Sequence, residues 1–167
     1  MLKKRDKGNI MDNNDIHEGG CSCGSARYKT IGYPIRHAVC HCRYCQLRTG
    51  APFGMGAYFD NKNVAIISGE FTNFHYTTIS GSEVKTSFCI KCGTTTHWEI
   101  YSELFTGTTA IAVGTYDPPS FWFKVEREVF LRSKAQFVNN DIKDKFETSI
   151  TYKPKGKDSV SKTPILK

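Results

Sequence analysis

The sequence predicts a mostly antiparallel all-β domain. Short segments rich in aromatic and β-branched residues alternate with Gly, Pro, Asn and Asp, which is typical of strands joined by turns. Nothing in the 167 residues shows a βαβ alternation or a long amphipathic helix. Seven cysteines lie in three close clusters, and spacings of one or two residues between them favour a shared metal ion.

The predicted strands follow one another from residue 25 to residue 131. The first, residues 25–31, alternates and is bounded by Gly24 and Gly32, as a short strand should be. The others have similar boundaries; they cover residues 35–39, 53–59, 64–67, 71–77, 84–88, 95–100, 108–113 and 126–131. A helical turn or two is predicted near the second cysteine cluster, over residues 43–47, because Gly50 and Pro52 stop it.

The ends of the chain differ from its middle in charge. We expect a basic and polar N-terminal tail over residues 1–17, a zinc-binding domain over residues 18–140 and a basic, flexible tail over residues 141–167. The formal net charge of +7 comes largely from lysines at both ends. Basic tails can bind nucleic acid or acidic partners, but a solvated, mobile terminus is the simpler interpretation. Residues 151–167 are polar and contain Pro154, Gly156 and Pro164, so we expect them to be disordered.

The number and spacing of the cysteines, and the composition of the N-terminal residues, predict the cellular compartment. An odd number of cysteines cannot pair off within one chain, and these spacings suit metal better than disulfides. The first residues contain no apolar segment of the kind found in secretory signals. No run approaches the roughly 18 apolar residues that a membrane span needs. We therefore expect a cytoplasmic protein, with no membrane partner, whose thiols stay free to bind metal.

Two cysteine doublets predict a closed structural zinc site. They are Cys21 and Cys23, then Cys89 and Cys92, and are called here the four-cysteine group. In an extended C-x-C segment both sulfurs lie on the same side, and a glycine after C-x-x-C suits the tight turn around a metal. A structural zinc contributes roughly 10–16 kcal/mol of apparent binding energy. The net stability of a typical domain is roughly 5–15 kcal/mol, so losing one of these thiolates should prevent folding.

The remaining triplet predicts a zinc site with an open position. Cys40, Cys42 and Cys45, called here the three-cysteine group, supply three sulfurs and no evident fourth ligand. Structural zinc sites are filled by protein, whereas catalytic ones keep one position for water or substrate. The middle residue of an extended C-x-C segment points away from the metal, so His41 is not expected to bind. A histidine brought in by the fold remains an alternative; the candidates are His37, His75 and His97.

Three cysteine motifs and one later segment carry a family resemblance. They are Gly20-Cys21-Ser22-Cys23-Gly24-Ser25-Ala26-Arg27-Tyr28, Cys40-His41-Cys42-Arg43-Tyr44-Cys45 with Thr49-Gly50, Phe88-Cys89-Ile90-Lys91-Cys92-Gly93-Thr94, and Val113-Gly114-Thr115-Tyr116-Asp117-Pro118. In this order they resemble the glutathione-dependent formaldehyde-activating enzyme family, also called the centromere protein V domain family. The resemblance runs from Gly19 to Val138 and includes all seven cysteines.

The resemblance implies a fold, two zinc ions and a reaction. The implied fold is Mss4-like, with small antiparallel sheets joined around zinc. The four-cysteine group would hold a structural zinc, and the three-cysteine group a catalytic one. The implied activity is that of a carbon–sulfur lyase that joins glutathione to formaldehyde, giving S-hydroxymethylglutathione in aldehyde detoxification. Many members carry the cysteines without a known substrate, so another aldehyde stays an alternative.

Two arginines near the triplet are candidates for recognising the thiol substrate. Arg43 and Arg48 could attract the carboxylates of glutathione, although surface charge explains them equally well. The sequence assigns no acid–base residue. The competing class is a non-catalytic, zinc-stabilised module that binds nucleic acid or a protein through its basic tails. The aromatic residues do not support single-strand binding, because they occupy alternating strand positions where a core is the simpler explanation.

Overall fold

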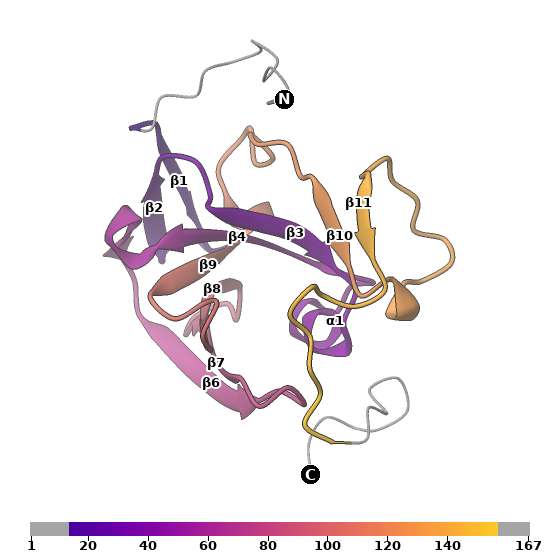
Figure 1. Cartoon of the computed structure of the whole chain (residues 1–167). Coiled ribbons are helices and arrows are strands. Elements are labelled where there is room, and N and C mark those ends of the chain that lie inside the picture. The colour runs from indigo at the N-terminus through magenta and orange to yellow at the C-terminus, as the bar shows by residue number, and fades with distance from the viewer. Residues whose placement is uncertain (1–13, 157–167) are drawn as a thin grey trace.

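The computed structural model describes residues 14–156 (Figure 1). The first part of the expected N-terminal tail and the end of the expected C-terminal tail lie outside the described residues. Within that range the strands are β1 (Ile16–Gly20), β2 (Arg27–Ile31), β3 (Arg36–Cys40), β4 (Gly54–Asp60), β5 (Val64–Ser68), β6 (Phe71–Thr77), β7 (Glu83–Cys89), β8 (Thr95–Tyr101), β9 (Thr108–Ala112), β10 (Arg127–Val129) and β11 (Asp144–Phe146). The helix α1 covers Arg43–Thr49, and single 3-10 turns cover Asn61–Asn63, Val113–Thr115 and Leu131–Ser133.

The strands form two sheets, which confirms the predicted mostly β class. The smaller sheet has the order β1-β2-β5 and the larger one the order β11-β10-β3-β4-β9-β8-β7-β6. Most neighbours are antiparallel, as predicted, but β10 pairs in parallel with both β3 and β11. The Mss4-like assignment stays a prediction. No helix in residues 14–156 is long and apolar enough to cross a membrane.

The main core lies where the two sheets meet. Tyr28 of β2 is fully buried, and its ring stands edge-on to Tyr116 with centroids 5.5 Å apart. The Tyr116 hydroxyl is 3.0 Å from that of Thr30, so the polar ends of these buried rings have partners. Gly19 approaches the same region, because a Cβ there would lie 2.4 Å from the Tyr28 hydroxyl. A bare backbone at residue 19 therefore lets β1 close over the core.

Two features near the ends were not predicted. β1 begins at Ile16, within the expected N-terminal tail, and pairs residue by residue with β2. Its sequence, Ile-His-Glu-Gly-Gly, has two glycines and little alternation, so no strand signal was visible. The expected C-terminal tail contributes β11, which extends the large sheet beside β10. Beyond β11 the chain passes α1 and runs toward the turn between β6 and β7 (Figure 1).

Candidate metal centres and the adjoining cavity

The three-cysteine group forms where β3 ends and α1 begins. Cys40 is the last residue of β3, Cys42 is the extended N-cap of α1, and Cys45 lies in the first turn of the helix. The three Sγ atoms all lie within 4.8 Å of one another. Cys40 pairs with Gly54 across the β3–β4 ladder, and a Cβ on Gly54 would lie 3.2 Å from the Cys45 Cβ. The glycine therefore makes room for the helix that carries Cys45.

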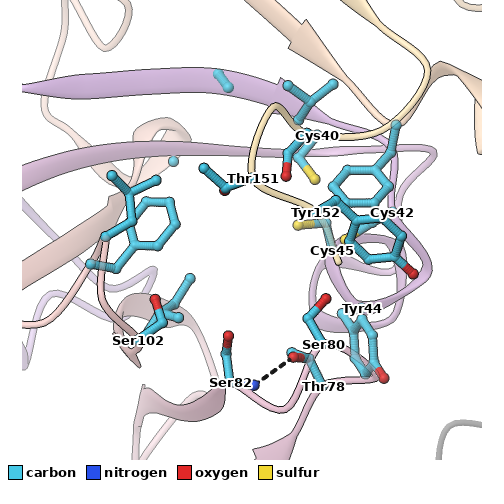
Figure 2. Close-up of a pocket in the computed structure, with 18 of the residues that line it drawn as sticks. Cys40, Cys42, Tyr44, Cys45, Thr78, Ser80, Ser82, Ser102, Thr151 and Tyr152 are labelled. Atoms are coloured by element: carbon cyan, nitrogen blue, oxygen red, sulfur yellow. Dashed lines mark hydrogen bonds between the residues drawn. The ribbon is translucent and has the colours of Figure 1, made fainter. Parts of the chain in front are cut away.

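The three-cysteine group lines a cavity of about 830 Å³. Figure 2 shows the Tyr152 ring beside Cys42 and Cys45, at the same side of the cavity as the sulfur atoms. Across the cavity stand hydroxyl-bearing side chains from the β6–β7 turn and the loop after β8: Thr78, Ser80, Ser82 and Ser102. A cavity of this size lies within the range, roughly 300–1,000 Å³, that encloses small organic ligands.

Arg48 connects the sulfur atoms to the aromatic wall of the cavity. Its Nη2 atom lies 3.4 Å from the Cys45 Sγ, and its guanidinium stacks 3.6 Å from the centre of the Trp98 ring. Trp98 is 2 % exposed, so the cation–π contact is screened from water. Tyr58 and Tyr76 also line the cavity, and burial raises the pKa of Tyr76 to about 12 and that of Tyr58 further. Both phenols are therefore neutral at pH 7 and able to donate hydrogen bonds.

The three thiols of this group differ in pKa. Hydrogen bonds from Cys40 and Cys42 hold the pKa of Cys45 well below its usual range, and Arg48 adds to this effect. The hydrogen bond with Cys42 raises the pKa of Cys40 well above its usual range. Cys45 is thus the thiol that ionises first, beside a fixed positive charge. A bound cation would deprotonate all three, because a coordinating thiol loses its proton outright.

His41, between two of these cysteines, turns to a different partner. Its side chain is fully buried, and its Nε2 atom lies 2.7 Å from Oε1 of Glu128, which is also fully buried. This agrees with the expectation that the middle residue of the C-x-C segment points away from a shared metal. The His41 backbone N–H donates to the Val129 carbonyl at 3.0 Å, so the segment between the ligands is fixed to β10 at both backbone and side chain.

The four-cysteine group joins the two sheets. Cys21 and Cys23 follow β1 of the small sheet, while Cys89 and Cys92 belong to the β7–β8 hairpin of the large sheet. Their four Sγ atoms lie within 4.8 Å of one another. Backbone N–H groups point at the sulfurs, from Ala26 to Cys21 at 3.2 Å and from residue 91 to Cys89 at 3.4 Å. None of these cysteines is among the described residues that line the large cavity.

Both groups fit a soft divalent cation. Four sulfurs at about 2.3 Å from one zinc ion in a tetrahedron stand about 3.8 Å apart. The Sγ atoms of Cys21 and Cys23 are 3.4 Å apart, and those of Cys23 and Cys89 are 3.9 Å apart. N–H groups directed at thiolates stabilise their negative charge, which an apolar thiol core would not need. In the described part of the chain, no His, Asp, Glu or fourth Cys joins the three-cysteine group.

The sequence identified the sulfur atoms but missed most of the cavity. Both cysteine groups come together as predicted, and the three candidate histidines stay outside them. Of the two candidate arginines, Arg48 lines the cavity, whereas Arg43 is exposed and is not among its described lining residues. The aromatic residues of the strands were predicted to form a core; Trp98 of β8 is buried but also forms a cavity wall. Nothing in the sequence signalled the contribution of residues 149–153.

The fold and these sites define a β protein with two cysteine groups that could hold metal ions, one of four sulfurs and one of three sulfurs at a cavity. The chain belongs to the glutathione-dependent formaldehyde-activating enzyme family, whose pattern it matches over residues 16–133. No curated protein matches the chain. Among solved structures, the crystal structure of a Rhodobacter sphaeroides protein, a structural genomics target, is similar at 19 % identity with a TM-score of 0.48. That comparison covers 65 % of this chain and 96 % of the other.

Proposed function

We propose that the chain is a zinc-dependent carbon–sulfur lyase that joins glutathione to formaldehyde, giving S-hydroxymethylglutathione. In this proposal the four-cysteine group holds a structural zinc, and Cys40, Cys42 and Cys45 are the ligands of a catalytic zinc. Membership of the family supports the glutathione and formaldehyde chemistry. The free state of all seven cysteines supports a reducing compartment such as the cytoplasm.

One observation supports a catalytic role for the three-cysteine group and a structural role for the four-cysteine group. Cys40, Cys42 and Cys45 all line the large cavity, whereas the four-cysteine group lies at the junction of the two sheets. The three-cysteine group therefore faces whatever ligand the cavity holds. A closed four-sulfur site suits a structural role, and a three-sulfur site beside a cavity suits catalysis.

The reaction needs little from the protein besides position and charge. The thiol sulfur forms a bond to the carbonyl carbon, the C=O π bond opens, and the thiol proton ends on the oxygen, giving R–S–CH₂–OH. A zinc ion on three thiolates would supply a Lewis acid for the incoming thiol or for the carbonyl oxygen. Arg48 offsets the excess negative charge of the sulfurs from 3.4 Å away. The neutral phenols of Tyr58 and Tyr76 are hydrogen-bond donors for the developing oxygen anion.

The reaction is tested by the exchange rate between glutathione and S-hydroxymethylglutathione at equilibrium, measured by NMR magnetisation transfer. It is measured without protein, with wild type and with Cys45→Ser, after the zinc content of each sample has been determined. We expect acceleration by wild type that disappears in Cys45→Ser while about one zinc per chain remains. Wild-type protein that holds two zinc ions and gives no acceleration would refute the proposed reaction.

A further inference from the structure

The C-terminal segment 144–156 forms a wall of the cavity, although the family match ends at residue 133. Residues 149–153 line the cavity together with the three-cysteine group. Figure 2 shows Thr151 near Cys40 and the Tyr152 ring beside Cys42 and Cys45. The face of the site that a substrate meets is therefore built partly from residues that the family pattern does not include.

Both ends of this segment are fastened to the domain. At its start, β11 pairs with β10, and the Phe130 N–H donates to the Thr148 carbonyl at 3.4 Å. At its far end, the Lys155 N–H donates to the Ile79 carbonyl at 3.0 Å. The Ile79 N–H in turn donates to the Tyr44 hydroxyl at 2.9 Å. The β6–β7 turn is thus held between α1, which carries Cys45, and the C-terminal segment.

The buried Glu128 carboxylate also contacts the start of this segment and the loop that precedes it. Glu128 of β10 accepts from Lys134 Nζ at 2.8 Å and from Asn140 Nδ2 at 2.7 Å, and it lies 3.6 Å from Lys145 Nζ. Its Oε1 atom is also 2.7 Å from His41 Nε2. The loop that leads into β11 and the C-x-C segment of the site therefore share one buried anchor.

Tyr152 is the part of the wall that is best placed to select a ligand. Its ring stands edge-on to Phe130 with centroids 5.1 Å apart, and the Arg132 guanidinium lies 5.0 Å from its centre. Arg132 Nη2 donates to the Tyr152 hydroxyl at 3.2 Å. These contacts hold the ring in one orientation at the side of the cavity where the sulfur atoms lie (Figure 2).

The charge of the lining indicates which ligands the cavity favours. Among its described residues Glu103 is the one acid, against several cations: Arg36, Arg48, Arg127, Arg132 and Lys153. Lys153 belongs to the C-terminal segment and Arg132 contacts it through Tyr152. A positive lining concentrates anions and favours carboxylates, which neutral small thiols lack.

We infer that the C-terminal segment is the specificity-determining wall of this site, and that Tyr152 and its anchored neighbours select a peptide-sized, carboxylate-bearing thiol over small neutral thiols. The inference rests on the proposed function in that it takes the occupant to be a thiol. Tyr152 acts here by contact with the body of the ligand. The hydrogen bond from the Lys155 N–H to the Ile79 carbonyl acts indirectly, by fixing the position of Tyr152 relative to the β6–β7 turn.

The experiment measures binding and turnover separately, on full-length protein that holds two zinc ions. Dissociation constants for glutathione and for 2-mercaptoethanol are determined by calorimetry, and the exchange of each thiol with formaldehyde is followed by NMR. Tyr152→Ala removes the ring, and Tyr152→Phe is its matched control. Lys155→Pro removes the N–H that donates to Ile79, whereas Lys155→Ala retains it.

We expect Tyr152→Ala and Lys155→Pro to weaken glutathione binding at least tenfold and to change 2-mercaptoethanol binding less than twofold. Tyr152→Phe and Lys155→Ala should stay within about threefold of wild type for both thiols. Equal effects on both thiols, or wild-type protein that binds glutathione no better than 2-mercaptoethanol, would overturn the inference. Selective glutathione binding without any acceleration of exchange would refute the proposed reaction. It would still support the inference that the C-terminal segment determines which thiol binds.

Discussion

The buried Glu128 carboxylate is expected to contribute about 3 kcal/mol to stability at neutral pH. Burial alone would raise its pKa, but hydrogen bonds from Lys134, Asn140 and His41 outweigh burial and lower the pKa from 4.5 to about 2. Each pKa unit corresponds to about 1.4 kcal/mol of difference between the folded and unfolded states. The shift of roughly 2.5 units therefore gives about 3 kcal/mol, in line with the 3–5 kcal/mol lost when a buried ion pair is broken.

The direction of the pH dependence follows from the lowered pKa. The folded carboxyl is harder to protonate than the unfolded one, so its contribution is complete above pH 4.5 and is lost as the pH falls toward 2. Protonation of thiolates also destabilises the protein in acid, but it acts alike on wild type and variant. The quantity to follow is therefore the difference between wild type and Glu128→Gln, expected to fall from about 3 kcal/mol at pH 7 to about 2 kcal/mol near pH 3.5.

The assay is urea unfolding of both proteins across this pH range, with zinc present at a fixed concentration. Glu126→Gln is the matched control, because Glu126 is exposed and lies two residues before Glu128. The control should change the free energy of unfolding by less than about 0.5 kcal/mol. A loss below about 1 kcal/mol in Glu128→Gln at pH 7, or a difference that grows as the pH falls, would refute the reasoning.

Three further predictions concern the metal groups and the cavity. Cys89→Ser should give little soluble protein, whereas Cys45→Ser should fold with about one zinc fewer by metal analysis; equal loss of soluble protein would make both groups structural. Arg48→Met should destabilise the domain by about 2–4 kcal/mol in thermal unfolding, because it loses a charge-assisted hydrogen bond and a cation–π contact; Arg48→Lys should lose less, and an unchanged melting temperature in Arg48→Met would contradict this. Gly56→Ala should cost about 1–3 kcal/mol, because its Cβ would lie 2.7 Å from the buried Trp98 ring; a neutral result would show that the ring can move.

Local spacing was enough to predict the two cysteine doublets and the triplet, because the cysteines within each are close together in sequence; that the doublets meet across 66 residues was predicted only from their number. The C-x-C and C-x-x-C spacings, each followed by a glycine at positive φ (Gly24 and Gly93), bring the sulfurs of each doublet to one side of the chain. The helix over residues 43–47 was also visible, since Gly50 ends it in the left-handed conformation with its N–H donating to Gln46.

The cavity could not be predicted, because it depends on which distant segments meet. Alternation assigned the aromatic residues of β4 and β8 to a core, yet Tyr58 and Trp98 also face the cavity. Period-two patterning tells which residues share a face but not what covers that face. The sequence assigned residues 149–153 to a basic tail, because their place at the cavity depends on the Phe130–Thr148 and Lys155–Ile79 backbone hydrogen bonds, which local patterning does not reveal.

The two cysteine groups differ in how soon a ribosome can complete them. The three-cysteine group is contained in residues 40–45, whereas Cys23 and Cys89 are 66 residues apart. At about 5–20 residues per second, synthesis leaves Cys21 and Cys23 waiting for about 3–13 seconds before their partners emerge. During that delay the sulfurs that join the two sheets are incomplete, so the small sheet is not yet fastened to the large one at this group. The local group would form early, and its occupancy alone would not report a finished domain.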